Sequence, residues 1–117
     1  MYKKNKFNAR KTKVDGHTFD SKKEAERYSE LKLMQRGGAI KYLQLQPKFT
    51  LLDGFYHDGK KIRAITYTAD FMYWDCENCV LVVEDVKSKA TVTDVYKIKR
   101  KLFLNRYGGD YKFKEVF

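Results

Sequence analysis

Residues 62–87 read IRAITYTADFMYWDCENCVLVVEDVK, and this stretch decides the fold. Its first half, 62–74, is rich in Ile, Thr, Tyr and Phe, and residues 80–86 form a nearly continuous aliphatic run. Such residues favour strands, and apolar side chains on both faces are typical of central strands that are covered on both sides. We therefore expect the two segments to pair as an antiparallel hairpin that closes through the four residues 76–79.

A loop of this length sets the register of the hairpin. It places Asp70 opposite Asp85, with the two Cβ atoms about 5 Å apart. Lys87 follows two residues after Asp85 and projects from the same face of the strand, whereas Glu84 points to the opposite face and pairs with Phe71. Two carboxylates and a lysine are therefore expected to converge on one patch of an otherwise apolar sheet.

Carboxylates that face each other in a sheet destabilise it unless their charge is neutralised. A divalent cation that bridges Asp70 and Asp85 removes this penalty, and hard oxygen ligands suit Mg²⁺, for which Mn²⁺ is expected to substitute. A metal bound there would polarise a phosphoryl oxygen and activate water, while Lys87 orients that water or offsets negative charge. The alternative is a structural ion pair, in which Lys87 only bridges to Asp85 or Glu84 at a strand end.

Two further segments have helical patterning. Ser21 and Glu24 fit a capping box, and apolar residues at helical spacing follow as far as the Gly37-Gly38 pair. The second segment is amphipathic and also ends at a pair of glycines, with its basic side chains away from the apolar face. These patterns predict helices over about 21–36 and 93–107.

The remaining apolar segments predict strands. Residues 14–19 read as a tight turn that leads into the first helix, and the Asp58-Gly59 pair signals a hairpin turn. Extended segments are expected at 39–45, 48–56, 62–74, 80–86 and 111–116. The predicted fold class is α/β: a mixed central sheet of four to five strands flanked by two helices, in the order helix, three or four strands, helix, strand.

The length and the net charge of the chain limit the classes of protein to which it can belong. The chain has 117 residues, which is one domain's worth, and a formal net charge of +10. A balance that basic favours a polyanionic partner, nucleic acid before a membrane surface. Residues 1–13 hold six basic side chains and no acid, so we expect them to be a flexible tail and 14–117 to be the folded domain. Because neither a membrane-length apolar run nor a signal segment is evident, we expect a cytoplasmic protein.

The spacing of the acidic residues and the lysine resembles a known family. Asp70, followed fourteen residues later by Glu84-Asp85-Val86-Lys87, is similar to the metal-binding core of the PD-(D/E)xK nuclease superfamily, and the predicted element order resembles its αβββαβ core. Three stretches, FDSKKEAERY (19–28), LQPKF (45–49) and TADF (68–71), resemble a small phage-encoded branch of unknown function. That branch is similar to Holliday-junction resolvases and transposase-type endonucleases.

The resemblance implies a role for each matching residue. Asp70 and Asp85 would be metal ligands together with the backbone carbonyl of Val86, and Lys87 would be the catalytic lysine. Glu24 matches the acid that such nucleases often place on the first helix. The capping box accounts for Glu24 equally well, so both interpretations stay open.

Two positions depart from the family's pattern. Ala69 stands where the superfamily's name has proline, and Asp85 stands where glutamate is more common. The second departure makes Glu84 a rival ligand, but the period of the strand directs Glu84 to the face opposite Lys87.

The second predicted helix carries the main candidates for contact with nucleic acid. Its basic flank is suited to follow a phosphate backbone, and the alternative is a merely solvated helix face. Gln46 is expected to approach the site from a neighbouring strand, or else to satisfy backbone groups beside Pro47. Tyr96 and Lys99 are expected nearest the scissile phosphate. The full set of predicted nucleic-acid contacts is Tyr96, Lys97, Lys99, Arg100 and Gln46.

The two cysteines, Cys76 and Cys79, have the spacing of half a zinc site. A structural zinc site needs four ligands, so a plain hairpin loop is the preferred interpretation. A dimer that assembles four thiolates is the alternative.

Together these observations predict a Mg²⁺-dependent DNA endonuclease that acts on branched or otherwise distorted duplex DNA, in phage replication or recombination. It would read backbone and shape rather than base edges, and it would act as a homodimer because one small chain spans little of a branched substrate. The alternatives are a non-catalytic basic DNA-binding protein and an RNA-binding or RNA-processing module.

Overall fold

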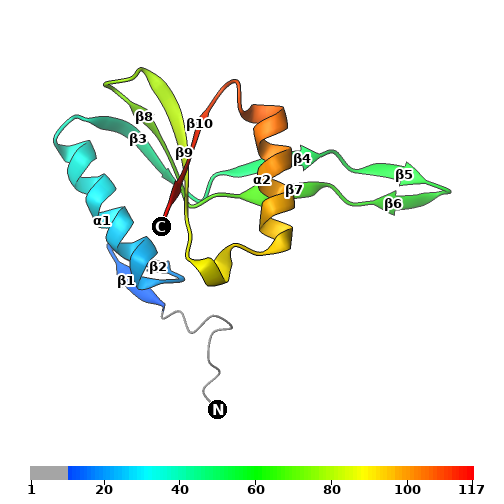
Figure 1. Cartoon of the computed structure of the whole chain (residues 1–117), viewed down its shortest axis with the longest axis horizontal. Coiled ribbons are helices and arrows are strands. Elements are labelled where there is room, and N and C mark those ends of the chain that lie inside the picture. Colours follow the sequence, from blue (N-terminus) through cyan, green and yellow to red (C-terminus); the bar gives the residue numbers. More distant parts are fainter. Residues whose placement is uncertain (1–10) are drawn as a thin grey trace, which may run out of the picture.

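The computed structural model describes residues 11–117 (Figure 1). Its elements, in chain order, are β1 (Thr12–Val14), β2 (His17–Phe19), α1 (Lys22–Arg36), β3 (Ile40–Leu45), β4 (Lys48–Leu52), β5 (Phe55–His57), β6 (Lys60–Ile62), β7 (Ile65–Thr68), β8 (Phe71–Asp75), β9 (Val80–Val86), α2 (Asp94–Tyr107) and β10 (Lys112–Val116). A short 3₁₀ turn, Lys89–Thr91, links β9 to α2.

A mixed sheet of four strands forms the centre, in the order β10-β9-β8-β3. β10 runs parallel to β9, whereas β8 is antiparallel to both of its neighbours, β9 and β3. α1 and α2 lie on opposite sides of this sheet (Figure 1). The predicted α/β class, with a mixed sheet flanked by two helices, is confirmed.

The alternation of side chains along β9 divides the interior into two cores. Val82 packs with Phe71, Tyr28 and Leu31 on the α1 face of the sheet. The next residue, Val83, packs with an aromatic group around Phe103 on the α2 face. Because successive side chains of a strand point to opposite faces, Glu84 belongs to the α1 face and Asp85 to the α2 face.

The predicted register of the central hairpin is confirmed. Phe71 pairs with Glu84 and Asp75 pairs with Val80, so residues 76–79 form the connecting turn. Asp70 lies just before β8, where its backbone N–H donates to the carbonyl of Glu84 at 3.0 Å. The bond goes to Glu84, the partner of Phe71, so the regular register ends at Phe71 and does not pair Asp70 with Asp85.

The expectation of one strand over 62–74 is wrong, because the chain changes partner at Ala69 and Asp70. Before this point β7 pairs with β4 in a separate two-stranded ribbon, and after it β8 joins the central sheet. The N–H of Ala69 still donates to the carbonyl of Pro47, at 3.0 Å, whereas that of Asp70 donates to β9. The break puts Asp70 at the junction of the two sheets.

The expected strand over 48–56 is also divided, at Asp53 and Gly54, into β4 and β5. β5 and β6 pair around the Asp58-Gly59 turn that the sequence predicts, and both turn residues have positive φ, 49° and 73°. The β5–β6 hairpin continues beyond the β4–β7 ribbon and extends away from the body of the molecule as an arm (Figure 1).

The expected boundary of the basic tail is placed too late. Thr12 and Lys13 belong to β1, which pairs with β2 around Asp15 and Gly16, and Val14 packs against the core on the α1 face. Strand pairing and this apolar contact explain why the folded part begins before residue 14. Residues 1–10 of the predicted tail lie outside the described residues.

The first helix begins at the predicted cap Ser21, and the second begins with a hydroxyl cap of the same kind. The hydroxyl of Ser21 accepts a hydrogen bond from the N–H of Glu24 at 3.1 Å, and that of Thr93 accepts from the N–H of Tyr96 at 3.1 Å. These bonds satisfy donors that a helix start leaves without a partner. No helix among residues 11–117 has the length and apolar character needed to cross a membrane.

Candidate active site

A cleft of about 550 Å³ opens where β7 and β9 meet the starts of α1 and α2. Glu24, Asp70, Asp85 and Lys87 all line it. These residues come from α1, from the junction before β8 and from the end of β9, and the register of the hairpin with the packing of α1 brings them together. We call Glu24, Asp70 and Asp85 the carboxylate cluster.

Asp85 is 2% exposed and has two partners. The hydroxyl of Tyr67 donates to its Oδ2 atom, and Lys87 Nζ lies 3.0 Å from its Oδ1 atom. Burial and the Asp85 carboxylate raise the pKa of Tyr67, so this hydroxyl remains a donor. Tyr67 therefore orients Asp85 within the cleft.

The side chain of Asp70 is hydrogen-bonded to the backbone of β9. Its Oδ2 atom accepts a hydrogen bond from the N–H of Val86 at 2.6 Å. Burial raises the pKa of Asp70 to about 8, and the neighbouring Asp85 and Glu24 carboxylates raise it further, against the opposing effects of the Val86 N–H and Lys87. In this environment the ionised form of Asp70 is costly.

Glu24, in the first turn of α1, is 7% exposed and lines the cleft. Burial raises its pKa to about 6, with further contributions from Asp20 and Asp85 and an opposing hydrogen bond with Asp70. Its backbone N–H makes the bond to Ser21 that caps α1. Ser21 therefore caps α1 through the backbone of Glu24, and the catalytic role of the Glu24 side chain stays a prediction.

Lys87 is held by contacts on both sides of the cleft. Its Nζ atom lies 4.2 Å from the centroid of the Tyr96 ring, and its backbone carbonyl accepts from Lys23 Nζ at 3.1 Å. The Tyr96 hydroxyl donates to Glu115 at 2.6 Å. The ring of Tyr96 thus supports the lysine, while its hydroxyl binds a residue of β10.

Glu84, the rival ligand, lies outside the cleft and is fully buried on the α1 face. Arg27 donates to both of its carboxylate oxygens, at 2.8 and 2.7 Å, and the Tyr73 hydroxyl donates to it as well. A bidentate interaction of this kind between arginine and a carboxylate is among the strongest charge-assisted contacts in proteins. The period argument that directs Glu84 away from Lys87 agrees with this geometry.

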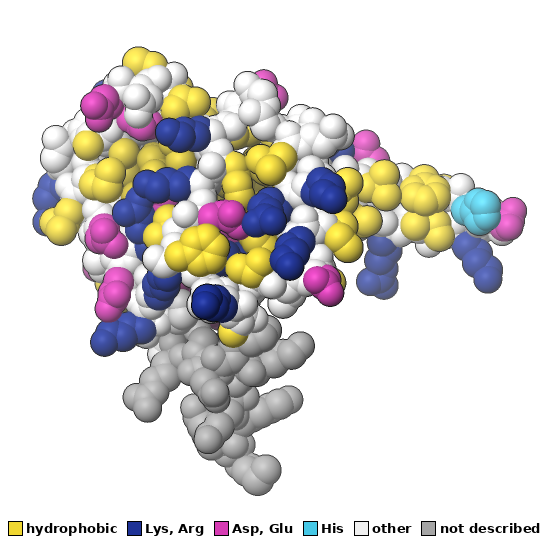
Figure 2. Space-filling model, viewed as in Figure 1, with side chains coloured by type: hydrophobic (Ala, Val, Ile, Leu, Met, Phe, Trp, Pro, Cys, Tyr) yellow, Lys and Arg dark blue, Asp and Glu magenta, His cyan; other side chains and the backbone are white. Residues whose placement is uncertain are grey.

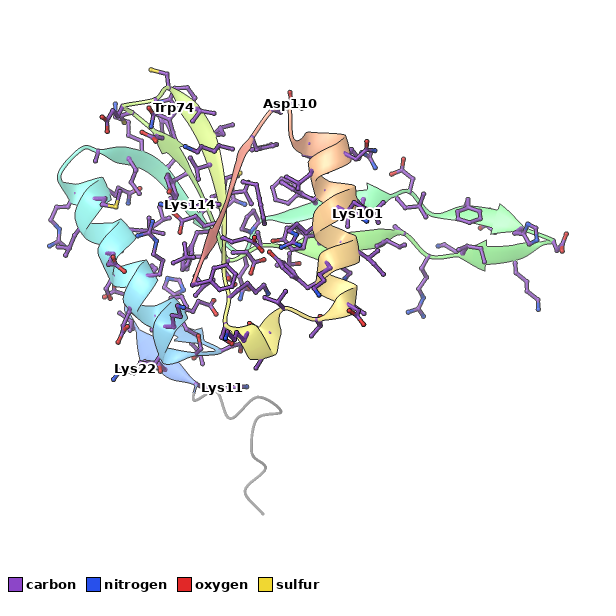
Figure 3. The ribbon with its side chains drawn as sticks, viewed as in Figure 1. Lys11, Lys22, Trp74, Lys101, Asp110 and Lys114 are labelled. Atoms are coloured by element: carbon purple, nitrogen blue, oxygen red, sulfur yellow. The ribbon has the colours of Figure 1, made fainter. Side chains whose placement is uncertain are left out.

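The predicted contacts for nucleic acid are only partly brought together. Lys99 and Tyr96 line the cleft. Lys97 lies instead on another face of α2, in a shallow hollow with Lys101, which is exposed (Figure 3). Arg100 is bound to Glu115 at 2.8 Å. The helical rotation of about 100° per residue separates Lys97 from Tyr96 and Lys99, whereas the Arg100 guanidinium lies 5.4 Å from the centroid of the Tyr96 ring. Contact of these residues with nucleic acid stays a prediction.

Gln46 lines a second cavity, of about 520 Å³, rather than the cleft itself. Glu24 and Asp70 line both cavities, so Gln46 approaches the carboxylate cluster from the other side. The space-filling view shows lysine and arginine side chains spread over α1 and α2 on the face that it presents (Figure 2).

The donor set of the cleft suits a hard divalent cation. Three carboxylates and one lysine share a largely buried place, where burial first and the neighbouring carboxylates second raise the pKa values of Glu24 and Asp70. Among residues 11–117 no three acidic, histidine or cysteine side chains already form a ligand group. Mg²⁺ usually keeps several waters and takes one or two protein carboxylates, so Asp70 and Asp85 fit it without a third. The predicted role of the Val86 carbonyl stays a prediction.

Sequence reasoning missed two residues that shape this region, Tyr67 and Arg27. A tyrosine in a buried strand usually finds a partner for its hydroxyl, and that signal pointed to Tyr67 without naming Asp85. No local pattern linked Arg27 to Glu84. Cys76 and Cys79 are free thiols in the β8–β9 turn, and Cys79 is exposed, as expected for a hairpin loop.

The structure thus defines a small α/β protein with a carboxylate cluster and a lysine in a cleft beside its central sheet. Residues 4–116 match a family described as protein of unknown function, DUF1064, and the chain belongs to that family. No curated protein and no solved structure matches the chain.

Proposed function

We propose that this protein is a Mg²⁺-dependent DNA endonuclease that hydrolyses phosphodiester bonds, with a preference for branched or otherwise distorted duplex DNA. The observation that carries the proposal is the shared cleft of Asp70, Asp85, Glu24 and Lys87. Acidic oxygens beside a lysine are the parts that metal-assisted phosphoryl transfer needs. The proposal also agrees with the resemblance of these residues to the PD-(D/E)xK nucleases.

In this proposal Asp70 and Asp85 hold the cation and Glu24 adds negative charge behind them. A bound Mg²⁺ would polarise the phosphoryl oxygen and lower the pKa of water. Lys87 Nζ, 3.0 Å from Asp85 Oδ1, is in reach of the same space, where it orients the attacking water and offsets charge on the phosphoryl oxygens. Tyr67 keeps Asp85 in position through its hydroxyl.

Charge supports nucleic acid as the substrate. The net charge of +10 favours a polyanion, and Lys99 lines the cleft within reach of a phosphate backbone. Contacts of this kind read backbone and shape rather than base sequence. A two-fold symmetric homodimer would present two such clefts to the paired strands of a branched substrate.

A non-catalytic DNA-binding function is the second candidate, and one contact favours it. The ion pair between Lys87 and Asp85 is already formed at 3.0 Å, as in the structural interpretation of this triplet. A protein of that kind would bind DNA with a steep dependence on salt but without a need for Mg²⁺ or Mn²⁺. The two candidates therefore differ in one measurable property.

The test is a cleavage assay with four-way-junction, flap, nicked, single-stranded and linear DNA, each with Mg²⁺, with Mn²⁺ and with EDTA. We expect metal-dependent cleavage that is fastest on the branched substrates. Asp85→Ala and Lys87→Ala should each lower the cleavage rate at least about 100-fold, equivalent to about 2.7 kcal/mol of transition-state stabilisation, while DNA binding in EDTA changes little.

Lys60→Ala is the matched control for Lys87→Ala, because it also removes a lysine but lies exposed on β6, in the arm. Cleavage that persists in Asp85→Ala would contradict the proposal, and binding without metal-dependent cleavage of any substrate would favour the non-catalytic candidate. Competition between RNA and DNA duplexes separates the RNA-processing alternative, since the A-form helix and the 2′-hydroxyls change the contacts.

A further inference from the structure

The second cavity is a groove between α1 and β3, and we call it the α1–β3 groove. The two elements lie side by side in the fold (Figure 1). Glu24, Lys32 and Gln35 line it from α1, and Gln44 and Gln46 line it from β3 and its end. Eleven residues separate Glu24 from Gln35, which corresponds to about 16 Å along the helix. The volume of about 520 Å³ is in the range of pockets that hold small organic ligands.

The groove is continuous with the proposed active site. Glu24 and Asp70 line both the groove and the cleft, so the carboxylate cluster forms the boundary between them. A phosphodiester bound at the cluster would have one of its flanking nucleosides on the groove side. Whatever the groove recognises is therefore directly joined to the scissile phosphate.

The two cavities differ in chemistry. The cleft offers Lys87, Lys99 and several threonine hydroxyls, which suit phosphate oxygens. The groove offers carboxamides and a single lysine, Lys32. Carboxamides donate and accept hydrogen bonds at once, so they suit the edges of nucleobases better than a phosphate chain. An exposed imidazole, His17 of β2, also lines the groove and offers a ring for stacking.

The side chains of Gln44 and Gln46 have no hydrogen-bond partner within the described residues 11–117. Gln35 differs, since its Oε1 atom accepts from the N–H of Leu43 at 2.9 Å. Two of the three carboxamides in the groove are thus available to a ligand, and the third orders the strand that carries them.

The backbone of Gln46 is strained, with a φ of +52°. This is the left-handed region that residues other than glycine rarely adopt and that costs free energy. The N–H of Gln46 donates to the carbonyl of Asp70 at 2.9 Å, which holds the strained residue against the carboxylate cluster. Glycine would satisfy the same backbone without strain, so the fold itself gains nothing from a glutamine side chain here.

We propose that the α1–β3 groove binds an unpaired nucleotide of the DNA strand next to the scissile phosphate, with Gln44 and Gln46 contacting the base. The inference rests on the proposed function and deepens it, because it names the feature of distorted DNA that is recognised. A paired base cannot enter the groove while it remains in the duplex. Selectivity for branched or tailed DNA then follows from the unpaired nucleotide rather than from the overall shape of the junction.

The test is DNA binding by the full-length protein in EDTA, measured by fluorescence anisotropy. The two probes are a duplex with a short single-stranded thymidine tail and a fully paired duplex of the same number of nucleotides. We expect the wild-type protein to bind the tailed probe more tightly. Gln46→Gly and Gln44→Ala should each weaken that binding about three- to tenfold and leave the paired probe unchanged.

Gln46→Gly is chosen because it deletes the side chain while relieving the strained backbone, so its thermal stability should equal or exceed that of the wild type. Asn105→Ala is the matched control, because it deletes an exposed carboxamide on α2 away from the groove. Equal affinity of the wild type for both probes, or equal losses on both probes in Gln46→Gly, would overturn the inference.

Measurement without metal separates this inference from the proposed function. A preference for the tailed probe in a protein that cleaves nothing would support the groove and reject the hydrolase. Metal-dependent cleavage without any preference for the tailed probe would support the hydrolase and reject the groove.

Discussion

Two neighbouring residues of β9 bury their carboxylates on opposite faces of the same sheet, with opposite outcomes. Glu84 is neutralised on the α1 face by Arg27, which donates to both of its oxygens, and by the Tyr73 hydroxyl. Asp85, on the α2 face, shares one lysine with Asp70 and Glu24. The first site is electrically balanced by the chain itself, whereas the second is left with excess negative charge.

The comparison between the two buried carboxylates indicates which of the two sites would bind a ligand. A buried carboxylate that is bound by a bidentate arginine has its charge neutralised and its hydrogen bonds formed. A cluster of three carboxylates with one cation is satisfied only by protons or by an added positive charge. Raised pKa values at Glu24 and Asp70 mark the second situation, and a cleft opens there.

The largest effect is expected from breaking the balanced site. Arg27→Met leaves Glu84 buried without its cation, and the loss of one partner from a buried ion pair costs about 3–5 kcal/mol. Urea unfolding followed by circular dichroism measures this change in the free energy of unfolding. Arg36→Met, at the exposed end of α1, is the control and should stay within about 0.5 kcal/mol of the wild type.

The double variant Arg27→Met with Glu84→Leu should recover much of the lost stability, because both charges are then removed. If Arg27→Met is as stable as Arg36→Met, the description of Glu84 as neutralised by Arg27 is wrong.

The next prediction concerns pH and the unbalanced site without divalent metal. The pKa of Asp70 is about 8 in the folded protein, whereas an aspartate in an unfolded chain titrates near 4. Between these values the folded state holds a proton that the unfolded state has released, so this group makes stability fall as pH rises from about 4 to 8.

Asp70→Asn removes that titration, so its thermal unfolding in EDTA should be less sensitive to pH than that of the wild type over this window. Asp110→Asn, at an exposed position, should keep the wild-type slope. Added Mg²⁺ should flatten the wild-type slope as well, since a cation bound by ionised carboxylates stabilises the folded state. A slope that Asp70→Asn leaves unchanged would show that another group dominates.

The smallest effect is expected from changes to Tyr96, whose ring contacts Lys87. Tyr96→Phe keeps the ring beneath the ammonium group and removes the hydroxyl that donates to Glu115 at 2.6 Å. The loss should cost about 1 kcal/mol of stability and leave the cleavage rate within a few-fold. Tyr96→Leu removes the ring too and should lower the rate further. Equal rates in the two variants would mean that the ring does not position Lys87.

Local sequence signals were enough for the central hairpin and both helices. The loop of residues 76–79 and the strict two-residue period of strands set the pairing of β8 with β9 and send Glu84 and Asp85 to opposite faces. The hydroxyl cap at Ser21 begins α1 through a bond that spans three residues. Each of these features depends on neighbours in sequence or on one hairpin turn, so it can be predicted from the sequence.

The missed features depend on contacts between distant parts of the chain. No periodicity marks Asp70 as the point where the chain leaves β4 for the central sheet, because 62–74 is uniformly favourable for strands. Which helix residue meets which strand carboxylate is set by the packing of α1 on the sheet, as for Arg27 and Glu84. The division of basic residues along α2 likewise depends on the face that packs.

The sequence alone thus determined the α/β class, the register of the hairpin and the opposite faces of Glu84 and Asp85, since strand period and turn length are local properties. Only the tertiary structure decided that Glu24 joins the two aspartates of the cleft, that Arg27 neutralises Glu84, and that a groove with Gln46 adjoins the cleft. The physical reason is that charge balance in a buried site depends on every element packed around it, and those neighbours are distant in sequence.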